Sequence, residues 1–194
     1  MKKLALLSVL FILVTAQTKW NFDGAHSSVG FSIDHMVISE VEGSFGTFTG
    51  TLESSSDDFK DAKITFEIDP STITTGNAKR DGHLKGKDFF NVEEFKKISF
   101  VSSSFTHVKG KKFKLVGEFT MHGVTKTVEL DVKHNGTIKD PWGNTRAGFK
   151  VTGELNREDF GLTYGKVMEA GGLLIGHDVT ININLEVTKA TKKK

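Results

Sequence analysis

Seven histidines are the residues of this sequence whose chemistry could serve catalysis or metal binding. They are His26, His35, His83, His107, His122, His134 and His177. They form no H-x-H or HExxH pattern, and no pair has the i, i+4 spacing that places two ligands on one helix face. The chain also has no cysteine. Because dedicated zinc sites are built from such clusters, we expect no metal site.

Asp23, His26 and Ser27 supply the residue types of a nucleophilic triad. A triad is defined by the geometry of its side chains rather than by closeness in sequence. The G-x-S-x-G turn that exposes a nucleophilic serine does not occur. The adjacent pairs Asp57-Asp58 and Glu93-Glu94 lie in polar segments and indicate solvated charge rather than an acid/base dyad. We therefore expect no catalytic residues and no cofactor.

Most of the chain alternates apolar and polar residues with a period of two, which is the pattern of half-buried strands. The alternation is clearest in residues 62–69, 112–121, 124–133, 147–155 and 178–187. Residues 29–33 and 98–105 continue it, and the phase slips at Gly46, as at a β-bulge. Most of the chain is therefore predicted to be β-sheet.

Turn residues separate these strands at Asp69-Pro70-Ser71, at His122-Gly123 and at 140–144. Tight turns join antiparallel neighbours, so about eight strands with one apolar face each predict a sandwich or an up-and-down barrel. The polar segment 77–91 interrupts the alternation, and a short helix is expected around 78–84.

The two ends of the chain are interpreted as additions to a single domain, residues 17–188. Residues 1–16 are typical of a signal peptide, because two lysines precede the apolar run 4–14 and Ala16 precedes a cleavage site. The run is shorter than the roughly 20 apolar residues of a transmembrane helix. The basic tail, 189–194, could touch an anionic membrane, but a frayed, solubilising end is the favoured explanation. We expect an exported protein, periplasmic or secreted.

The charge balance argues against a nucleic-acid partner. The chain has 26 basic and 24 acidic residues, and the surplus lies in the leader at Lys2 and Lys3. Nucleic-acid-binding domains show a basic face or a strongly basic isoelectric point.

The absence of cysteine also excludes disulfides, thiol chemistry and a lipoprotein anchor.

Phenylalanine and glycine have unusual counts. The chain has 16 Phe but one Tyr and two Trp, and 20 Gly but two Pro. Phenylalanine buries a large apolar surface without a hydroxyl that needs a partner, which favours a dry interior. A closed barrel of about eight strands either fills with side chains or holds one small ligand. Composition leaves both alternatives open, a filled core and a lined cavity.

The motifs along the chain resemble the YceI-like family of exported, lipocalin-like polyisoprenoid-binding proteins. The matching residues are, in chain order, Trp20, Asp23, His26-Ser27, Phe31, His35-Met36, Gly43, Phe45, 71–75, 77–84, 88–90, 122–126 and 156–162. They are spread over nearly the whole chain after the leader. The resemblance implies a mainly all-β fold, an elongated eight-stranded antiparallel lipocalin-like β-barrel with a short helical segment near residues 77–91.

In such a barrel, an isoprenoid chain or another amphiphile would lie in the tube. The inward apolar rows expected to bind it are Phe31, Ile33, Phe66, Ile68, Phe100, Phe113, Phe119, Leu130, Phe149, Val151, Ile181 and Ile183. A second group would form either a clasp that closes one end or the mouth around the head group. It comprises His35, Arg80, Asp81 and His83.

The leading hypothesis is a non-enzymatic carrier or store of an isoprenoid lipid, such as a quinone or a polyprenyl lipid, outside the cytoplasm. A filled-core barrel with a structural or interaction role is the alternative. An enzyme that acts on the lipid head group through His83 or His122 is the third hypothesis. We expect a lipid as the partner, with transient membrane contact, and the oligomeric state stays open, a dimer included.

Overall fold

The computed structural model describes residues 17–165, 167–168 and 171–190. The expected signal peptide, 1–16, and residues 191–194 of the expected tail lie outside this part. The strands are β1 (Thr18–Phe22), β2 (Ser28–His35), β3 (Ser39–Phe45), β4 (Phe48–Ser54), β5 (Lys63–Ile68), β6 (Ile73–Thr74), β7 (Ile98–Lys109), β8 (Lys112–Met121), β9 (Val124–Lys139), β10 (Thr145–Asn156) and β11 (Ile175–Lys189). The helical elements are α1 (Ala78–Lys85) and two 3-10 turns, η1 (Pro70–Thr72) and η2 (Arg157–Phe160).

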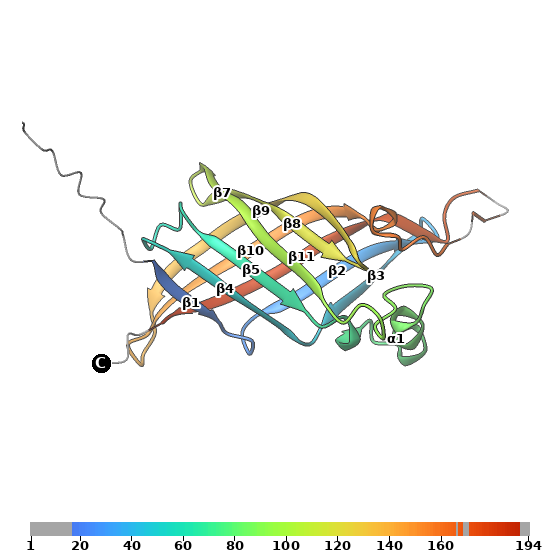
Figure 1. Ribbon diagram of the computed structural model, residues 1–194, viewed down its shortest axis with the longest axis horizontal. Coiled ribbons are helices and arrows are strands. Elements are labelled where there is room, and N and C mark those ends of the chain that lie inside the picture. Colours follow the sequence, from blue (N-terminus) through green and yellow to red (C-terminus); the bar gives the residue numbers. More distant parts are fainter. Residues whose placement is uncertain (1–16, 166, 169–170, 191–194) are drawn as a thin grey trace, which may run out of the picture.

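Eight of these strands close into an antiparallel barrel. Their order is β1-β4-β5-β7-β8-β9-β10-β11, and pairing of β1 with β11 completes the ring. The predicted turn His122-Gly123 joins β8 to β9, and both residues have positive φ angles, 52° and 78°, as a two-residue hairpin turn requires. The expected eight-stranded antiparallel barrel with one short helix is confirmed (Figure 1).

Two strands extend one end of this barrel. β2 continues along β11 beyond the length that pairs with β1, and β3 pairs with β2. β3 and β4 are separated at Gly46, whose N–H donates to the carbonyl of Thr72 at 3.2 Å. The predicted phase slip at Gly46 is thus a break between two consecutive strands rather than a bulge within one. The extended end is more open than the opposite end.

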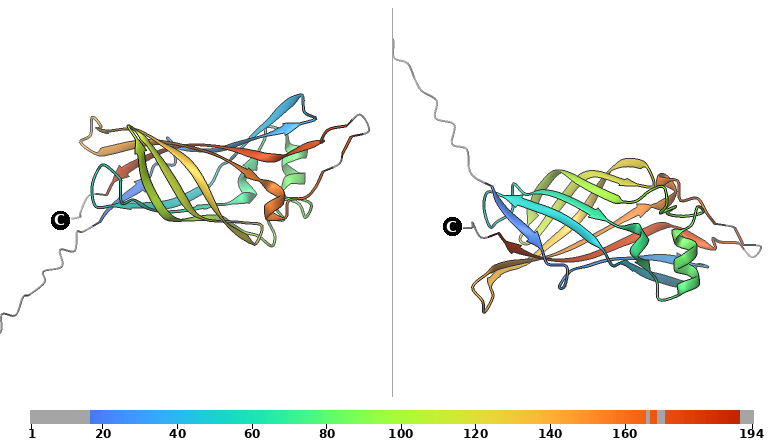
Figure 2. Two further views of the ribbon diagram at one scale, coloured as in Figure 1. Left: turned by 90° about the horizontal axis from the view of Figure 1, so that it is seen from above. Right: turned by 60° about the horizontal axis from the view of Figure 1, so that its bottom comes forward.

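Helix α1 lies at this extended end (Figures 1 and 2). It begins after Asn77, whose side-chain oxygen accepts from the N–H groups of Lys79 and Arg80 at 3.1 Å, and it ends at Gly86. Its eight residues include none that is buried. The helix is therefore held by specific contacts rather than by a packed apolar face. Across the described part of the chain, no helix has the length and apolar character needed to cross a bilayer.

The opposite end of the barrel is filled by aromatic side chains. Phe59, in the loop between β4 and β5, and Trp20 of β1 are both fully buried, and their ring centroids lie 4.9 Å apart. Phe59 also meets the rings of Phe149 and His134 at 5.0 and 5.2 Å. We call this the closed end, and the end with α1 the open end.

Several phenylalanine rings lie over glycines of neighbouring strands. Phe31 stands opposite Gly43 in the β2–β3 register, and Phe66 stands opposite Gly50 in the β4–β5 register. A Cβ atom at either glycine would lie closer than 3.0 Å to the facing ring. A larger residue would displace the ring, so at these positions a phenylalanine and a glycine depend on each other. The glycines make room for large rings inside a narrow barrel.

Candidate functional site

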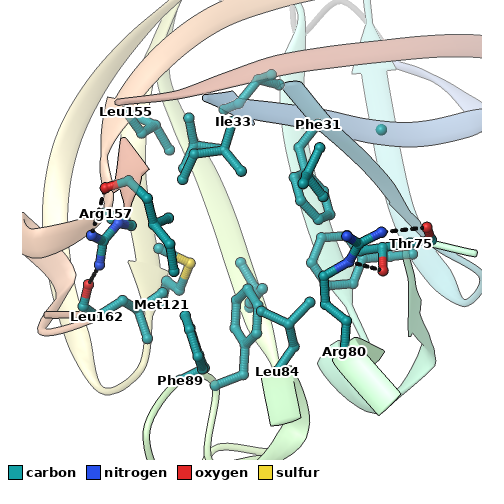
Figure 3. A pocket seen from close by; sticks show the side chains of 18 of the residues that line it. Phe31, Ile33, Thr75, Arg80, Leu84, Phe89, Met121, Leu155, Arg157 and Leu162 are labelled. Atoms are coloured by element: carbon teal, nitrogen blue, oxygen red, sulfur yellow. Dashed lines mark hydrogen bonds between the residues drawn. The ribbon is translucent and has the colours of Figure 1, made fainter. Parts of the chain in front are cut away.

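A cavity of about 570 Å³ occupies the open end of the barrel. Its walls come from β2, β3, β5, β7, β8, β10 and β11, from α1 and the segment after it, and from η2 and the loop that follows; they are almost entirely apolar. Figure 3 shows Ile33, Leu155 and Met121 around the central space, with Phe89 and Leu84 on the side of α1. The cavity ends where the packed closed end begins.

Half of the residues expected to line the tube do line this cavity. They are Phe31, Ile33, Ile68, Phe119, Ile181 and Ile183. The first two lie on β2 and the last two on β11, which pair with each other. The extension of the barrel by β2 is therefore what brings these side chains together.

The other half lie in the packed interior instead. They are Phe66, Phe100, Phe113, Leu130, Phe149 and Val151, each no more than 9% exposed. Phe113 stacks on Phe105 at 4.7 Å, and Phe149 packs against Phe59. For these six positions the structure replaces the expected tube lining with a filled core, because other buried side chains occupy the barrel at this level. The two alternatives for the interior, filled core and lined cavity, occupy different lengths of one barrel.

Some lining residues come from segments that the sequence pattern left aside. Leu84, Phe89 and Phe90 reach the cavity from the polar segment 77–91. Their only signal in the sequence was that they are apolar residues in otherwise polar surroundings. Tyr164 reaches it from the loop after η2.

Arg80 and Asp81 are both bound to the segment that precedes α1. Arg80 donates from Nε to the Thr75 hydroxyl at 2.7 Å and from Nη2 to the Thr75 carbonyl at 3.0 Å. Asp81 accepts from the Thr75 hydroxyl at 2.6 Å and from its N–H at 2.8 Å, and these hydrogen bonds lower the pKa of the Asp81 carboxyl. Arg80 lines the cavity and Asp81 does not. The pair thus fixes α1 across the open end.

His35 and His83 also line the cavity. His83 lies 3.0 Å from the Asp88 carboxylate, and its ring meets those of Phe89 and Tyr164 edge-on at 5.0 and 4.9 Å. These three rings join α1, the segment after it and the loop after η2. His122 instead packs its ring against Phe95 at 4.3 Å in the β8–β9 turn, and it is not among the lining residues.

Arg157 is a buried cation in the cavity wall, only 4% exposed. Its guanidinium donates to the backbone carbonyls of Gly176 at 2.8 Å, of Leu162, and of Ile175 at 3.4 Å. Burial lowers the pKa of Arg157, while the nearby charge of Glu158 opposes this shift. Arg80 and Arg157 lie on opposite sides of the cavity (Figure 3). Both are committed to backbone acceptors that hold the surrounding loops.

The residues of the apparent triad lie outside the cavity. Asp23 binds His26 at 3.0 Å, but Ser27 exchanges hydrogen bonds with the backbone of Glu186 rather than with His26. Carboxylate or imidazole atoms of Asp23, His26 and Glu186 lie within 4.8 Å of one another. Arg146 supplies the positive charge there, at 2.7 Å from Asp23 and 2.5 Å from Glu186. This cluster ties the loop after β1 to β10 and β11.

The comparison with protein families shows to which family this chain belongs. The model of the YceI-like domain matches residues 20–187. The chain belongs to the YceI-like family. A UPF0312 protein of Staphylococcus aureus (strain MSSA476) is similar to this chain in sequence. It is 42% identical over 170 residues, which cover 87% of this chain and 96% of that protein.

Solved structures share the YceI-like barrel. The Campylobacter jejuni YCEI protein has a TM-score of 0.71 at 27% identity, covering 98% of this chain and all of that one. Burkholderia cenocepacia BcnA has a TM-score of 0.75 at 21% identity, over 88% of this chain and all of that one. A polyisoprenoid binding domain from Saccharophagus degradans has a TM-score of 0.60 at 15% identity, over 88% of this chain and 98% of that one. At such identities the last two show the fold alone.

Proposed function

We propose that this YceI-like barrel binds the chain of an isoprenoid or similar amphiphilic lipid, such as a quinone or a polyprenyl lipid, in its open-end cavity. The observation that carries the proposal is the apolar cavity itself. Its volume of about 570 Å³ falls within the ~300–1,000 Å³ typical of ligand pockets. The solved relative that is a polyisoprenoid binding domain supports the same ligand class.

An apolar wall is sufficient for strong binding of such a chain. Burying hydrocarbon contributes roughly 0.8 kcal/mol per CH₂ group, so one five-carbon isoprene unit contributes roughly 4 kcal/mol before ordering costs. The cavity stops at the packed closed end, so the barrel encloses a limited length of chain. The ligand's head group would then lie at the open end, near His35, Arg80 and His83.

The proposed role is carriage or storage outside the cytoplasm, without catalysis. The signal-like residues 1–16 support export. Two of the charged groups of the cavity wall, Arg80 and Arg157, are engaged with backbone carbonyls, which supports a structural role for them rather than a catalytic one. Catalysis requires a nucleophile or base placed against the reacting atom. Turnover of a lipid head group that disappears on substitution of His83 would contradict this role.

The test uses two matched substitutions that place a carboxylate on an inward strand position. Ile33→Asp alters the half-buried cavity wall, and Phe113→Asp alters the packed core, where the ring is 4% exposed. We expect Ile33→Asp to fold and to bind lipid at least tenfold more weakly, because the carboxylate faces the apolar chain. We expect Phe113→Asp to unfold, because a buried unpaired charge has no compensation.

The measurements are native mass spectrometry of co-purified lipid and uptake of a quinone and a polyprenol by the purified protein. Circular dichroism reports folding. Wild-type protein that carries no lipid and takes up neither probe would refute the lipid proposal and favour the structural or interaction role. Equal uptake by wild type and Ile33→Asp would place the ligand outside this cavity.

A further inference from the structure

We infer that the open end of the barrel docks onto a lipid bilayer through the tip of the β2–β3 hairpin. The tip consists of Met36, Val37 and Ile38, which are 39%, 69% and 86% exposed. The inference rests on the proposed function, because it names the surface through which a water-insoluble ligand would be exchanged. It adds a partner, the bilayer, and assigns the contact to residues outside the cavity wall.

The backbone of the tip disfavours the residues that occupy it. Met36 and Val37 have φ angles of 54° and 65°, two consecutive residues in the left-handed region. Hairpin turns of this kind favour Asn-Gly, and a β-branched residue such as valine is rare at positive φ. Backbone hydrogen bonds hold the tip, since Met36 N–H donates to Leu174 at 3.1 Å. The turn alone would be served better by polar residues, so its apolar side chains need another explanation.

A second loop, between η2 and β11 (residues 161–174), lies beside the tip. Gly172 is close enough to Val37 that a Cβ atom on it would lie 3.0 Å from the Val37 methyl group. The same loop exposes Val167 by 75% and, where it meets the cavity wall, Tyr164 by 38%. Of the nine exposed large hydrophobic residues in the described ranges, five belong to these two loops. The β2–β3 hairpin and the coloured parts of the second loop lie at the end of the molecule that holds α1 (Figure 2).

The geometry favours a bilayer over a protein as the partner. Stable protein interfaces bury about 1,200–2,000 Å² of well-fitted surface, whereas this surface is the narrow end of two projecting loops. Apolar side chains on a projecting tip can enter the boundary between head groups and acyl chains without a complementary surface. The cavity lies at the same end, and His35 and Leu174 of its wall adjoin the two loops, so docking would bring the cavity close to the phase in which an isoprenoid lipid dissolves.

Charge has a secondary part in this contact. Lys79, Arg80, Lys85 and Lys87 outnumber Asp81 and Asp88 in and just after α1, which favours anionic head groups nearby. Asp34 and Glu40 on the hairpin offset part of this attraction. Apolar insertion therefore carries the contact, and binding should persist at high salt, which screens exposed charges.

The test measures flotation with vesicles of phosphatidylcholine containing phosphatidylglycerol, in low and in high salt. The variant Met36→Asn/Val37→Gly removes two apolar side chains and installs the residues that the turn prefers. We expect its melting temperature to equal or exceed that of the wild type and its vesicle partition to fall at least tenfold. The matched control, Ile138→Ser/Trp142→Ser, removes two exposed apolar residues at the closed end and should keep partition within twofold of wild type.

All proteins are compared in the same processed form, verified by mass, because an apolar leader would itself bind vesicles. Absence of wild-type binding, or equal losses in the two variants, would overturn the docking proposal. So would a wild-type dimer that the tip variant converts to a monomer, since the tip would then contact a second copy. Uptake of a soluble short-chain quinone, unchanged in the tip variant, separates docking from ligand binding. Failure of the wild type in that assay would count against the cavity proposal.

Discussion

The ring of Phe59 packs against the indole of Trp20 with 4.9 Å between centroids, and this contact closes the barrel opposite α1. Phe59 reaches the interior from a loop, so the plug is not part of the barrel wall. Neither Phe59 nor the rings it meets, those of Trp20, Phe149 and His134, line the cavity. The contact therefore stabilises the closed end of the barrel at a distance from the cavity wall.

Replacing Phe59 with alanine should destabilise the fold and leave the cavity wall in place. The loss of a fully buried phenylalanine costs about 3–5 kcal/mol in free energy of unfolding. We expect urea denaturation to report this loss, and native mass spectrometry to show the same bound chains as in the wild type, because Phe59 does not line the cavity. Phe59→Leu retains much of the packing and should recover part of the stability. A change in the length of the bound chain in Phe59→Ala would contradict this separation of the closed end from the cavity.

Replacing Thr75 with valine should loosen α1 over the cavity. The hydroxyl of Thr75 accepts from Arg80 and donates to Asp81, and valine removes both hydrogen bonds. At about 1 kcal/mol for each hydrogen bond, local opening of α1 should become at least tenfold more frequent. Hydrogen exchange of the α1 amides measures the opening, and quinone dissociation rate measures its effect. Thr75→Ser keeps the hydroxyl and should show the wild-type hydrogen exchange and the wild-type quinone dissociation rate. A dissociation rate in the valine variant equal to that of the wild type would show that α1 does not gate the cavity.

Replacing Arg157 with lysine should destabilise the loop after η2. The planar guanidinium serves the carbonyls of Leu162, Gly176 and Ile175, an arrangement that a lysine ammonium cannot reproduce. We expect a loss of about 3 kcal/mol in free energy of unfolding, as when a buried charged network is broken. Limited proteolysis should cleave within 161–174 before other sites. Lys126→Met, which removes an exposed ion pair with Asp159, is the control and should change stability little.

The cluster around Arg146 should make the fold resistant to acid. Hydrogen bonds from His26 and Arg146 lower the pKa of Asp23 to about 2. Burial opposes ionisation of Asp140, yet hydrogen bonds from Arg146 and Asn144 still lower its pKa to about 2. These carboxylates stabilise the fold above the unfolded pKa of about 3.9, and the contribution is lost as the pH falls toward 2.

Arg146→Met removes the cation that Asp23 and Asp140 share. We expect lower stability at neutral pH and an acid-unfolding midpoint shifted upward toward about pH 4. Fluorescence during acid titration measures the midpoint. Lys114→Met, which removes an exposed cation between Glu129 and Asp131, should leave it in place. Identical midpoints for wild type and Arg146→Met would contradict this account of the cluster.

The barrel could be predicted from the sequence because its strands alternate regularly and its turns carry diagnostic residues. His122-Gly123 and the strand patterns such as 112–121 depend only on neighbours in sequence. A short helix was expected around 78–84, and the structure has it at Ala78–Lys85, where Asn77 caps its start and Gly86 ends it. Local information was sufficient for these elements.

The boundary between cavity and core could not be predicted in the same way. Ile33 and Phe113 both occupy inward positions of regular strands, and the alternation does not distinguish them. Ile33 faces the cavity where β2 extends the barrel along β11. The core at Phe149 is instead filled by Phe59, a loop residue with a φ angle of 60° that enters the barrel from outside the strand pattern. Such a contact joins parts that are distant in sequence, and a single sequence gives no direct sign of it.

The division of the interior along the barrel axis separates the residues that hold the protein together from those proposed to meet its ligand. Substitutions at Ile33 or Ile181 alter a wall that faces space, whereas those at Phe149 or Leu130 remove packing on all sides. Under the proposed function, ligand preference would be free to change during evolution with little loss of folding stability. The same division would let protein engineers alter the cavity wall while leaving the packed core unchanged.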